Sequence, residues 1–263
     1  MHIIQYLLIH VSTFWLSFSI IFFYVFSTIS GLIVIRKFYP YKRCKNHNDI
    51  AGFIFATLGV IYAVTLAFVV VVTWEQFDKA NEITSSEANC IASLYQNTMP
   101  FPAEFRARLK AELTDYVYAI INDEWKTMEK GQRSPNVNEL QEKIVRSYSS
   151  FQPKNETQKI FLAESIKKLN EASELRRQRI LYAGTGIHPI MYIILFIGSI
   201  ITITFSMLFG TENFTEHLIM SSALAVMIAL SLFTIVALDY PFVGDFSIDP
   251  DCFVKILPTL LSK

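Results

Sequence analysis

Charged residues are scarce in this sequence, and they are unevenly placed. Asp, Glu, Lys and Arg make up 17% of its 263 residues, against about 25% in a typical soluble domain. Four windows contain none of them: between His2 and Arg36, between Asp49 and Glu75, between Arg179 and Glu212, and between Glu216 and Asp239. Each window can hold the roughly 20 apolar residues that cross a bilayer as a helix. The sequence therefore predicts four transmembrane helices, near residues 12–35, 51–74, 187–209 and 218–238.

The motifs of enzymes and of nucleic-acid-binding proteins are also missing. The five histidines are dispersed, and there is no glycine-rich phosphate loop, nucleophile elbow or Cys–His pairing. The charged central part of the chain is electrically balanced and has no basic stripe. No charged residue lies near the middle of a predicted span, which argues against a proton relay or an ion-coupled transporter. We therefore expect no enzyme activity, no nucleic-acid partner and, apart from the calcium site considered below, no cofactor.

Most of the charge lies in a central block whose pattern is helical. Small and apolar residues from Phe77 to Leu94 recur at steps of three and four, which continues the second span as a helix beyond the membrane. A similar series from Phe105 predicts a long amphipathic helix that runs to Lys130 and ends at Gly131, and two further helices follow. The predicted fold class is an all-α membrane protein. Its parts are transmembrane helices one and two (1–74), a helical extramembrane domain (75–183), helices three and four (184–238) and a C-terminal tail (239–263).

The basic residues beside the spans do not determine the orientation of the protein in the membrane. Five lie between the first two spans, and five flank the membrane on the other side: Arg36, Lys37, Lys42, Arg43 and Lys45 against Lys79, Arg176, Arg177, Arg179 and Lys255. The positive-inside rule therefore gives a tie. Arg176 or Arg179 could also pair with Glu75 near the membrane surface, or the arginines could contact anionic lipid headgroups.

A set of short motifs extends from the second span to the end of the fourth. It comprises Ala63-Val64-Thr65-Leu66-Ala67-Phe68, Trp74-Glu75, Glu87-Ala88, Leu94-Tyr95, Tyr116, Glu124-Trp125, Arg176-Arg177-Gln178-Arg179 and Leu238-Asp239-Tyr240-Pro241-Phe242-Val243-Gly244. Over about residues 50–253 this set resembles the bacterial bestrophin-like family, which is remotely related to the bestrophin chloride channels. The resemblance implies a homo-oligomer in the bacterial inner membrane, a pentamer as in bestrophins, with the second span facing the axis of an ion pore. It also implies that the central domain and both termini lie in the cytoplasm.

The second span offers candidates for the lining of such a pore. Val64, Phe68 and Val71 lie on one side of the helix at steps of four and three. A narrow apolar constriction resists water and ions, so these side chains are predicted to form a neck. The alternative is that they are ordinary packing or lipid-facing residues. Glu75 follows on the same side and could form a ring of carboxylates at the pore mouth, where it would favour cations.

A stripe of small residues also follows the second span. It consists of Gly52, Ala56, Gly59, Ala63 and Ala67. Small residues allow two helices in a membrane to approach closely. This small-residue stripe either packs against span one or span three or faces the pore.

Four carboxylates lie close together in the sequence after the fourth span: Asp239, Asp245, Asp249 and Asp251. They could supply oxygen ligands to calcium, as the acidic segment of bestrophins does at this place. Alternatively, each of them caps a turn, because Pro241, Gly244 and Pro250 make the segment irregular. The nearly unbroken acidic run of bestrophins is not present in this chain.

The residues and the resemblance together lead to one functional hypothesis and one alternative. We expect a homo-oligomeric, bestrophin-like ion channel in contact with membrane lipid, with an apolar neck lined by the second transmembrane helix. The alternative is a membrane scaffold or stress sensor that conducts no ions and acts through its helical domain.

Overall fold

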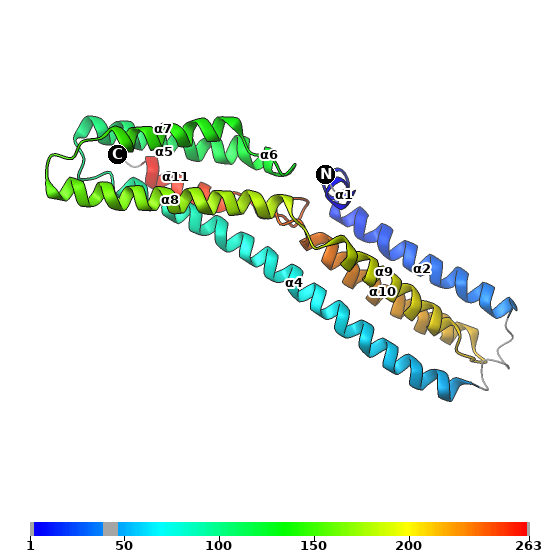
Figure 1. Ribbon diagram of the computed structural model, residues 1–263. Coiled ribbons are helices and arrows are strands. Elements are labelled where there is room, and N and C mark those ends of the chain that lie inside the picture. The colour runs from blue at the N-terminus through cyan, green and yellow to red at the C-terminus, as the bar shows by residue number, and fades with distance from the viewer. Residues whose placement is uncertain (1–2, 39–46, 262–263) are drawn as a thin grey trace. The chain divides into compact units, whose positions relative to one another are not determined.

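Helices form the regular structure of residues 3–38 and 47–261, the part of the chain that the computed structural model describes, and this part contains no strand (Figure 1). They are α1 (Ile3–His10), α2 (Thr13–Phe38), α4 (Asn48–Gln96), α5 (Ala103–Ala119), the π-helix η1 (Ile120–Glu124), α6 (Trp125–Met128), α7 (Pro135–Ser150), α8 (Glu156–Gly184), α9 (Pro189–Met207), α10 (Phe214–Leu238) and α11 (Asp251–Leu261). The all-α prediction is confirmed. The predicted basic residues Lys42, Arg43 and Lys45 lie outside the described residues.

The helices belong to two compact units, which we describe separately. The membrane unit consists of Ile3–Glu75 and Ile187–Asp239, and the helical unit consists of Gln76–Gly186 and the residues from Tyr240 onward. The long helix α4 contributes residues to both.

The membrane unit holds the four spans predicted from the charge-free windows. Among the described residues, four helical segments are long and apolar enough to cross a membrane, and they contain α2, the first part of α4, α9 and α10. A backbone in lipid must satisfy its own hydrogen bonds, which a helix does within each turn. Buried hydroxyls of the spans also form hydrogen bonds: Thr28 donates to the carbonyl of Tyr24 at 2.8 Å, and the Tyr24 hydroxyl bonds to that of Ser199 at 2.8 Å.

Local sequence signals define the helices of the helical unit. The Ser134 hydroxyl accepts a hydrogen bond from the amide of Val137 at 3.4 Å, and Pro135 occupies the first helical position of α7. The Asn155 side chain caps α8 by accepting from the amide of Gln158 at 2.8 Å. Apolar side chains of these helices, of α5 and of the second part of α4 form the core of the unit.

One helix of this unit differs from its prediction. The α-helical pattern that we expected to reach Lys130 ends at Ala119, and the chain continues through the π-helix η1 and the short helix α6 to Met128. Gly131 lies in the turn that follows, with φ at +67°, a conformation that glycine adopts without steric cost.

The C-terminal segment is also more ordered than the predicted tail. It contains the helix α11, whose Phe253 is fully buried in the core of the helical unit. The Tyr95 hydroxyl donates to the carbonyl of Leu260 at 2.6 Å. The prolines and the glycine between residues 241 and 250 led us to predict an irregular tail. The sequence analysis therefore missed the helix that follows them and its apolar face.

A close helix contact in the membrane unit gives a first testable prediction. A Cβ atom added at Gly198 of α9 would lie 2.5 Å from the ring of Tyr62 on α4, and that ring is held by a hydrogen bond from its hydroxyl to the carbonyl of Leu195 at 3.2 Å. We expect Gly198→Ala to destabilise the protein by about 1–3 kcal/mol, the usual effect of overpacking, as measured by thermal unfolding in detergent. Gly52→Ala is the control, because its added Cβ would meet nothing closer than 4.0 Å. Equal stability of the two variants would contradict the contact.

Candidate functional site

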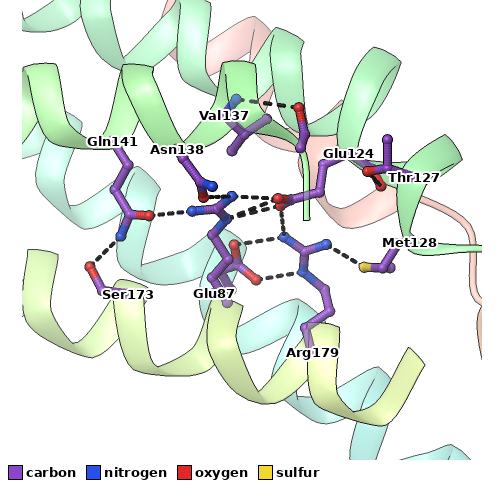
Figure 2. A network of polar contacts seen from close by, with 11 residues as sticks. Glu87, Glu124, Thr127, Met128, Val137, Asn138, Gln141, Ser173 and Arg179 are labelled. Carbon is purple, nitrogen blue, oxygen red and sulfur yellow. Dashed lines mark hydrogen bonds and ion pairs between the residues drawn. The ribbon is translucent and has the colours of Figure 1, made fainter. Parts of the chain in front are cut away.

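The helical unit buries four charged side chains that bond to one another (Figure 2). They are Glu87 of α4, Glu124 of η1, and Arg176 and Arg179 of α8. No more than 5% of any of these residues is exposed. The two negative and two positive charges cancel, so this buried ion network brings no net charge into the interior.

Arg179 binds both carboxylates. Its Nε donates to Oε2 of Glu87 at 2.7 Å, and its Nη2 donates to Oε1 of Glu87 at 3.0 Å. This two-point contact matches the planar guanidinium to the carboxylate. The same Nη2 donates to Oε2 of Glu124 at 2.9 Å. Arg179 therefore links α4 to η1.

Arg176 binds Glu124 from a second direction. Its Nε lies 3.1 Å and 3.0 Å from the two carboxylate oxygens of Glu124. Its Nη2 donates to Oδ1 of Asn138 at 2.8 Å, and its Nη1 donates to the side-chain oxygen of Gln141. The Gln141 amide donates in turn to the Ser173 hydroxyl at 2.6 Å. These contacts bring α7 into the network.

Soft and aromatic groups surround the Arg179 guanidinium. Its central carbon lies 5.1 Å from the ring centre of Trp125 and 5.5 Å from that of Phe253, distances typical of cation–π contacts. Its Nη1 contacts the sulfur of Met128 at 2.9 Å. The Trp125 indole donates to the carbonyl of Ile248 at 3.1 Å. The segment after the fourth span therefore contacts an aromatic side chain that packs on the Arg179 guanidinium.

Glu124 reaches the network from the π-helical turn. The amide of Trp125 bonds to the carbonyl of Ile120, five residues earlier. A π-turn inserts one residue into an α-helix and is frequent at functional sites. It rotates the side chains that follow around the helix axis, and here it accompanies the burial of both Ile120 and Glu124.

Burial and the arginines shift the pKa values of the two carboxylates in opposite directions. For Glu87, burial raises the pKa above its usual value, and the attraction of Arg179 only partly offsets this effect. For Glu124, burial also acts to raise the pKa, but the hydrogen bonds and charges of Arg176 and Arg179 outweigh it, so that the pKa is lowered. Because Glu124 faces two guanidinium groups, its ionised form is the better stabilised of the two.

The predicted partners of the arginines were wrong. The sequence suggested that Arg176 or Arg179 pairs with Glu75 or contacts lipid headgroups, whereas both are buried and bind Glu124 and Glu87. Arg177 is exposed and pairs with Glu174 on its own helix. These arginines lie close to the third span in the sequence, so we expected partners near the membrane surface. Their partner Glu124 instead lies between α5 and α6.

A signal for this network was present in the sequence. Leu169, Ala172, Arg176, Arg179 and Ala183 follow one another at steps of three and four, and all five are buried on α8. Glu87 occupies a similar place between Ile83 and Ile91 on α4. Charges at apolar positions of a helix predict buried ion pairs, since an unpaired charge there is very costly.

The pore-lining candidates are exposed on α4 in the single chain. The exposed fractions are 50% for Val64, 67% for Phe68 and 51% for Val71, and Glu75 is exposed as well. These positions therefore do not pack on the other spans of their own chain, and their role as a pore lining stays a prediction.

Most of the small-residue stripe is uncovered in the single chain. Ala56, Ala63 and Ala67 are exposed, and a Cβ added at Gly59 would meet no atom within 4 Å. Gly52 touches only the ring of Phe209, at 4.0 Å. Apart from this contact of Gly52, the stripe shows no packing against span one or span three of the same chain, and its role in helix packing stays a prediction.

The four predicted calcium ligands have different surroundings. Asp239 is buried, and its carboxylate accepts a hydrogen bond from the amide of Ile187 at 2.6 Å and another from the hydroxyl of Tyr192 at 2.8 Å. Asp245, Asp249 and Asp251 are exposed. Within the described residues, no group of three or more His, Cys, Asp or Glu side chains is arranged to hold a metal ion. Calcium binding stays a prediction.

The fold and the spans define a multi-pass, all-helical membrane protein. The sequence profile of the Bestrophin-like domain matches residues 21–253. The chain therefore belongs to the bestrophin-like family, and the resemblance noted from its motifs is confirmed. A search of curated proteins finds no match.

Solved structures share this fold. A variant of a bacterial bestrophin homolog from Klebsiella pneumoniae with one substitution is similar at a TM-score of 0.67 and 14% identity, over 94% of this chain and 99% of that chain. The structure of a homolog from the same organism, solved by Zn-SAD phasing, is similar at a TM-score of 0.64 and 14% identity, over 93% and 97% of the two chains. At this identity the likeness shows the fold.

The buried ion network leads to the second prediction. Arg179→Ala leaves the carboxylate of Glu87 buried without a charged partner, and we expect the helical unit to lose about 3–5 kcal/mol of stability. Arg177→Ala is the matched control on the same helix, since an exposed ion pair contributes about 0–1 kcal/mol. Denaturant unfolding followed by tryptophan fluorescence measures both. If the two variants unfold at the same denaturant concentration, the network is not what stabilises the unit.

Proposed function

We propose that the protein is a homo-oligomeric ion channel of the bacterial inner membrane, whose pore is lined by α4. The observation that carries the proposal is the poor cover of α4 within one chain. Only 11% of its most apolar window is buried, the lowest of the four spans, against 17% for α2, 28% for α10 and 33% for the segment that contains α9. A span so uncovered has most of its surface available for lipid, for another copy or for a pore. Membership of the bestrophin-like family favours the last two.

The chemistry along the exposed side of α4 suits a gated pore. Repeated around an axis, Val64, Phe68 and Val71 would form an apolar neck that excludes water and ions when it is narrow. Glu75 lies next on the same side and is exposed, and a ring of these carboxylates would attract cations to the mouth. No catalytic constellation is part of this proposal, and we infer that the protein is not an enzyme.

The small-residue stripe is the proposed contact between copies. Its alanines are exposed within the chain and Gly59 has no neighbour near its Cβ position, and close approach of backbones is a main source of helix association in lipid. By analogy with bestrophins we propose a pentamer, with the helical unit in the cytoplasm. In that arrangement the buried ion network holds α4, the pore helix, within the helical unit of each copy.

Ion flux tests the neck. Changing Val64, Phe68 and Val71 singly to Ser should ease passage for at least the residue that faces the axis. A barrier lowered by about 1 kcal/mol corresponds to a roughly fivefold higher flux. Chloride and potassium flux should be measured separately in liposomes. Val70→Ser is the control, because Val70 packs against the other spans of its own chain.

If the assembled protein carries neither ion and no substitution opens a path, the channel proposal fails. The protein would then act as a membrane scaffold or stress sensor through its helical unit.

Assembly tests the stripe. Gly59→Leu places a bulky side chain in the centre of the proposed contact, and overpacking of about 1–3 kcal/mol would weaken each contact between copies roughly 5- to 150-fold. The fraction of oligomer in detergent, measured by light scattering, should fall. Ala223→Leu on α10, where Ala223 is exposed in the chain, is the control. An unchanged oligomer in Gly59→Leu would place the stripe against lipid or open space.

A further inference from the structure

A cavity of about 440 Å³ lies inside the membrane unit, between α4, α9 and α10. Most of its lining is apolar and includes the side chains of Phe55, Phe209, Met220 and Leu224. Cavities that bind small molecules in proteins usually measure about 300–1,000 Å³ and are mainly apolar with a few polar groups. This cavity is therefore large enough for a ligand with an apolar body.

Paired hydrogen bonds fix the outer edge of the cavity. The Asn48 side-chain amide donates to the carbonyl of Gly210 at 2.7 Å, and the amide of Gly210 donates to the side-chain oxygen of Asn48 at 2.9 Å. These bonds join the first residue of α4 to the loop between α9 and α10. Leu224 lies roughly 15 Å along α10 from its first residue, at 1.5 Å per residue. The cavity therefore extends from the ends of the spans into their apolar part.

Aromatic rings form one wall of the cavity. The ring centre of Phe55 lies 5.5 Å from that of Phe209, with the two planes at 77°. Phe205 supports this pair, because its ring centre lies 5.9 Å from that of Phe55. Aromatic rings attract one another in edge-to-face and offset-stacked arrangements, so this wall suits a ligand that contains an aromatic ring.

Two polar side chains of α10 line the cavity and are almost fully buried. Ser221 is 3% exposed and His217 is 5% exposed. Nε2 of His217 lies 3.0 Å from the carbonyl oxygen of Ser206. A carbonyl oxygen can only accept, so Nε2 carries the hydrogen atom and Nδ1 of the neutral ring is an acceptor. Within residues 3–38 and 47–261, neither this Nδ1 nor the Ser221 hydroxyl forms a hydrogen bond.

These two groups select the polar part of a ligand. His217 and Ser221 are four residues apart and therefore lie on the same side of α10. Together they offer one acceptor and one hydroxyl, which a ligand hydroxyl matches by donating to the first and accepting from the second. No Asp, Glu, Lys or Arg of the described residues lines the cavity, so the ligand carries no charge.

Water and lipid tails match the cavity less well. One water molecule could bond to both polar groups, but the apolar walls offer too few partners to the further waters needed to fill the space. An acyl chain would fill the apolar part and leave both buried polar groups unpaired, although such groups are normally hydrogen-bonded.

We propose that this cavity binds an alkyl-substituted phenol dissolved in the membrane. The aromatic ring packs on Phe55 and Phe209, and its hydroxyl donates to Nδ1 of His217 and accepts from the Ser221 hydroxyl. The alkyl substituent lies against Met220 and Leu224. The site lies within one chain and does not rest on the proposed pore.

Photolabelling of the full-length protein in detergent tests the site. The probe is a phenol with a diazirine in its alkyl chain, and labelled peptides are identified by mass spectrometry. We expect labels on peptides that contain Phe55 or Met220. At equal concentrations in the detergent phase, 4-hexylphenol should prevent labelling about 2- to 12-fold more effectively than hexylbenzene, the range for one hydrogen bond. Hexylbenzene has the same apolar body without the hydroxyl.

Variants localise the recognition of the hydroxyl. Ser221→Ala should remove most of the preference for 4-hexylphenol over hexylbenzene. Ser231→Ala is the control on the same helix, because the Ser231 hydroxyl already donates to the carbonyl of Met227 at 2.9 Å, and this variant should keep the preference. Met220→Trp fills part of the cavity and should reduce labelling itself. Met220 is 60% exposed, so this larger side chain can be accommodated without unfolding the protein.

Two results would overturn the proposal. Labels that avoid the peptides of the cavity, or that persist in full in Met220→Trp, would show that the phenol binds elsewhere. Equal protection by 4-hexylphenol and hexylbenzene, or a preference that survives in Ser221→Ala, would show that the cavity takes up apolar molecules without reading a hydroxyl through Ser221.

Discussion

Two guanidinium groups and two carboxylates are buried together in the helical unit, and removing any one of them would leave another charge unmatched. Each charge alone would be very costly in the interior, so Glu87, Glu124, Arg176 and Arg179 are tolerated only as a set. The four side chains come from α4, η1 and α8, and Asn138 and Gln141 of α7 accept hydrogen bonds from Arg176. A structure that misplaced any one of these helices would leave an unmatched charge. Removing any one member therefore destabilises the unit, because the charges that remain are buried without a match.

The roles within the network are unequal. Arg179 contacts both carboxylates, an aromatic pair and a methionine sulfur, whereas Arg176 contacts one carboxylate and reaches polar side chains of α7. Glu124 receives hydrogen bonds from both arginines, and Glu87 from Arg179 alone. Glu124, which makes this double contact, is the last residue of the π-turn. An uninterrupted α-helix would carry the side chains beyond Ala119 around the axis in a different register.

The sequence predicted the spans well because lipid imposes a simple rule: charges are absent wherever the chain crosses. It predicted the site poorly because a pairing between Glu87 and Arg179, 92 residues apart, leaves no trace in local spacing. What it did contain was the placement of Arg176 and Arg179 at apolar positions of α8. The π-turn was missed because its residues fit an α-helical pattern equally well. The exposed face of α4 is a different case, since the neighbours that we propose for it belong to other copies of the chain.

The wide separation of the network's members also bears on biosynthesis. Ribosomes add about 5–20 residues per second, so the 92 residues between Glu87 and Arg179 take roughly 5 to 20 s to make. During that interval the helix that carries Glu87 already exists without its arginine. The carboxylate must then stay hydrated, and the second part of α4 cannot close into a core. The ion network thus cannot be completed before α8, which directly precedes the third span, and the core is completed only when α11 supplies Phe253 after the fourth span.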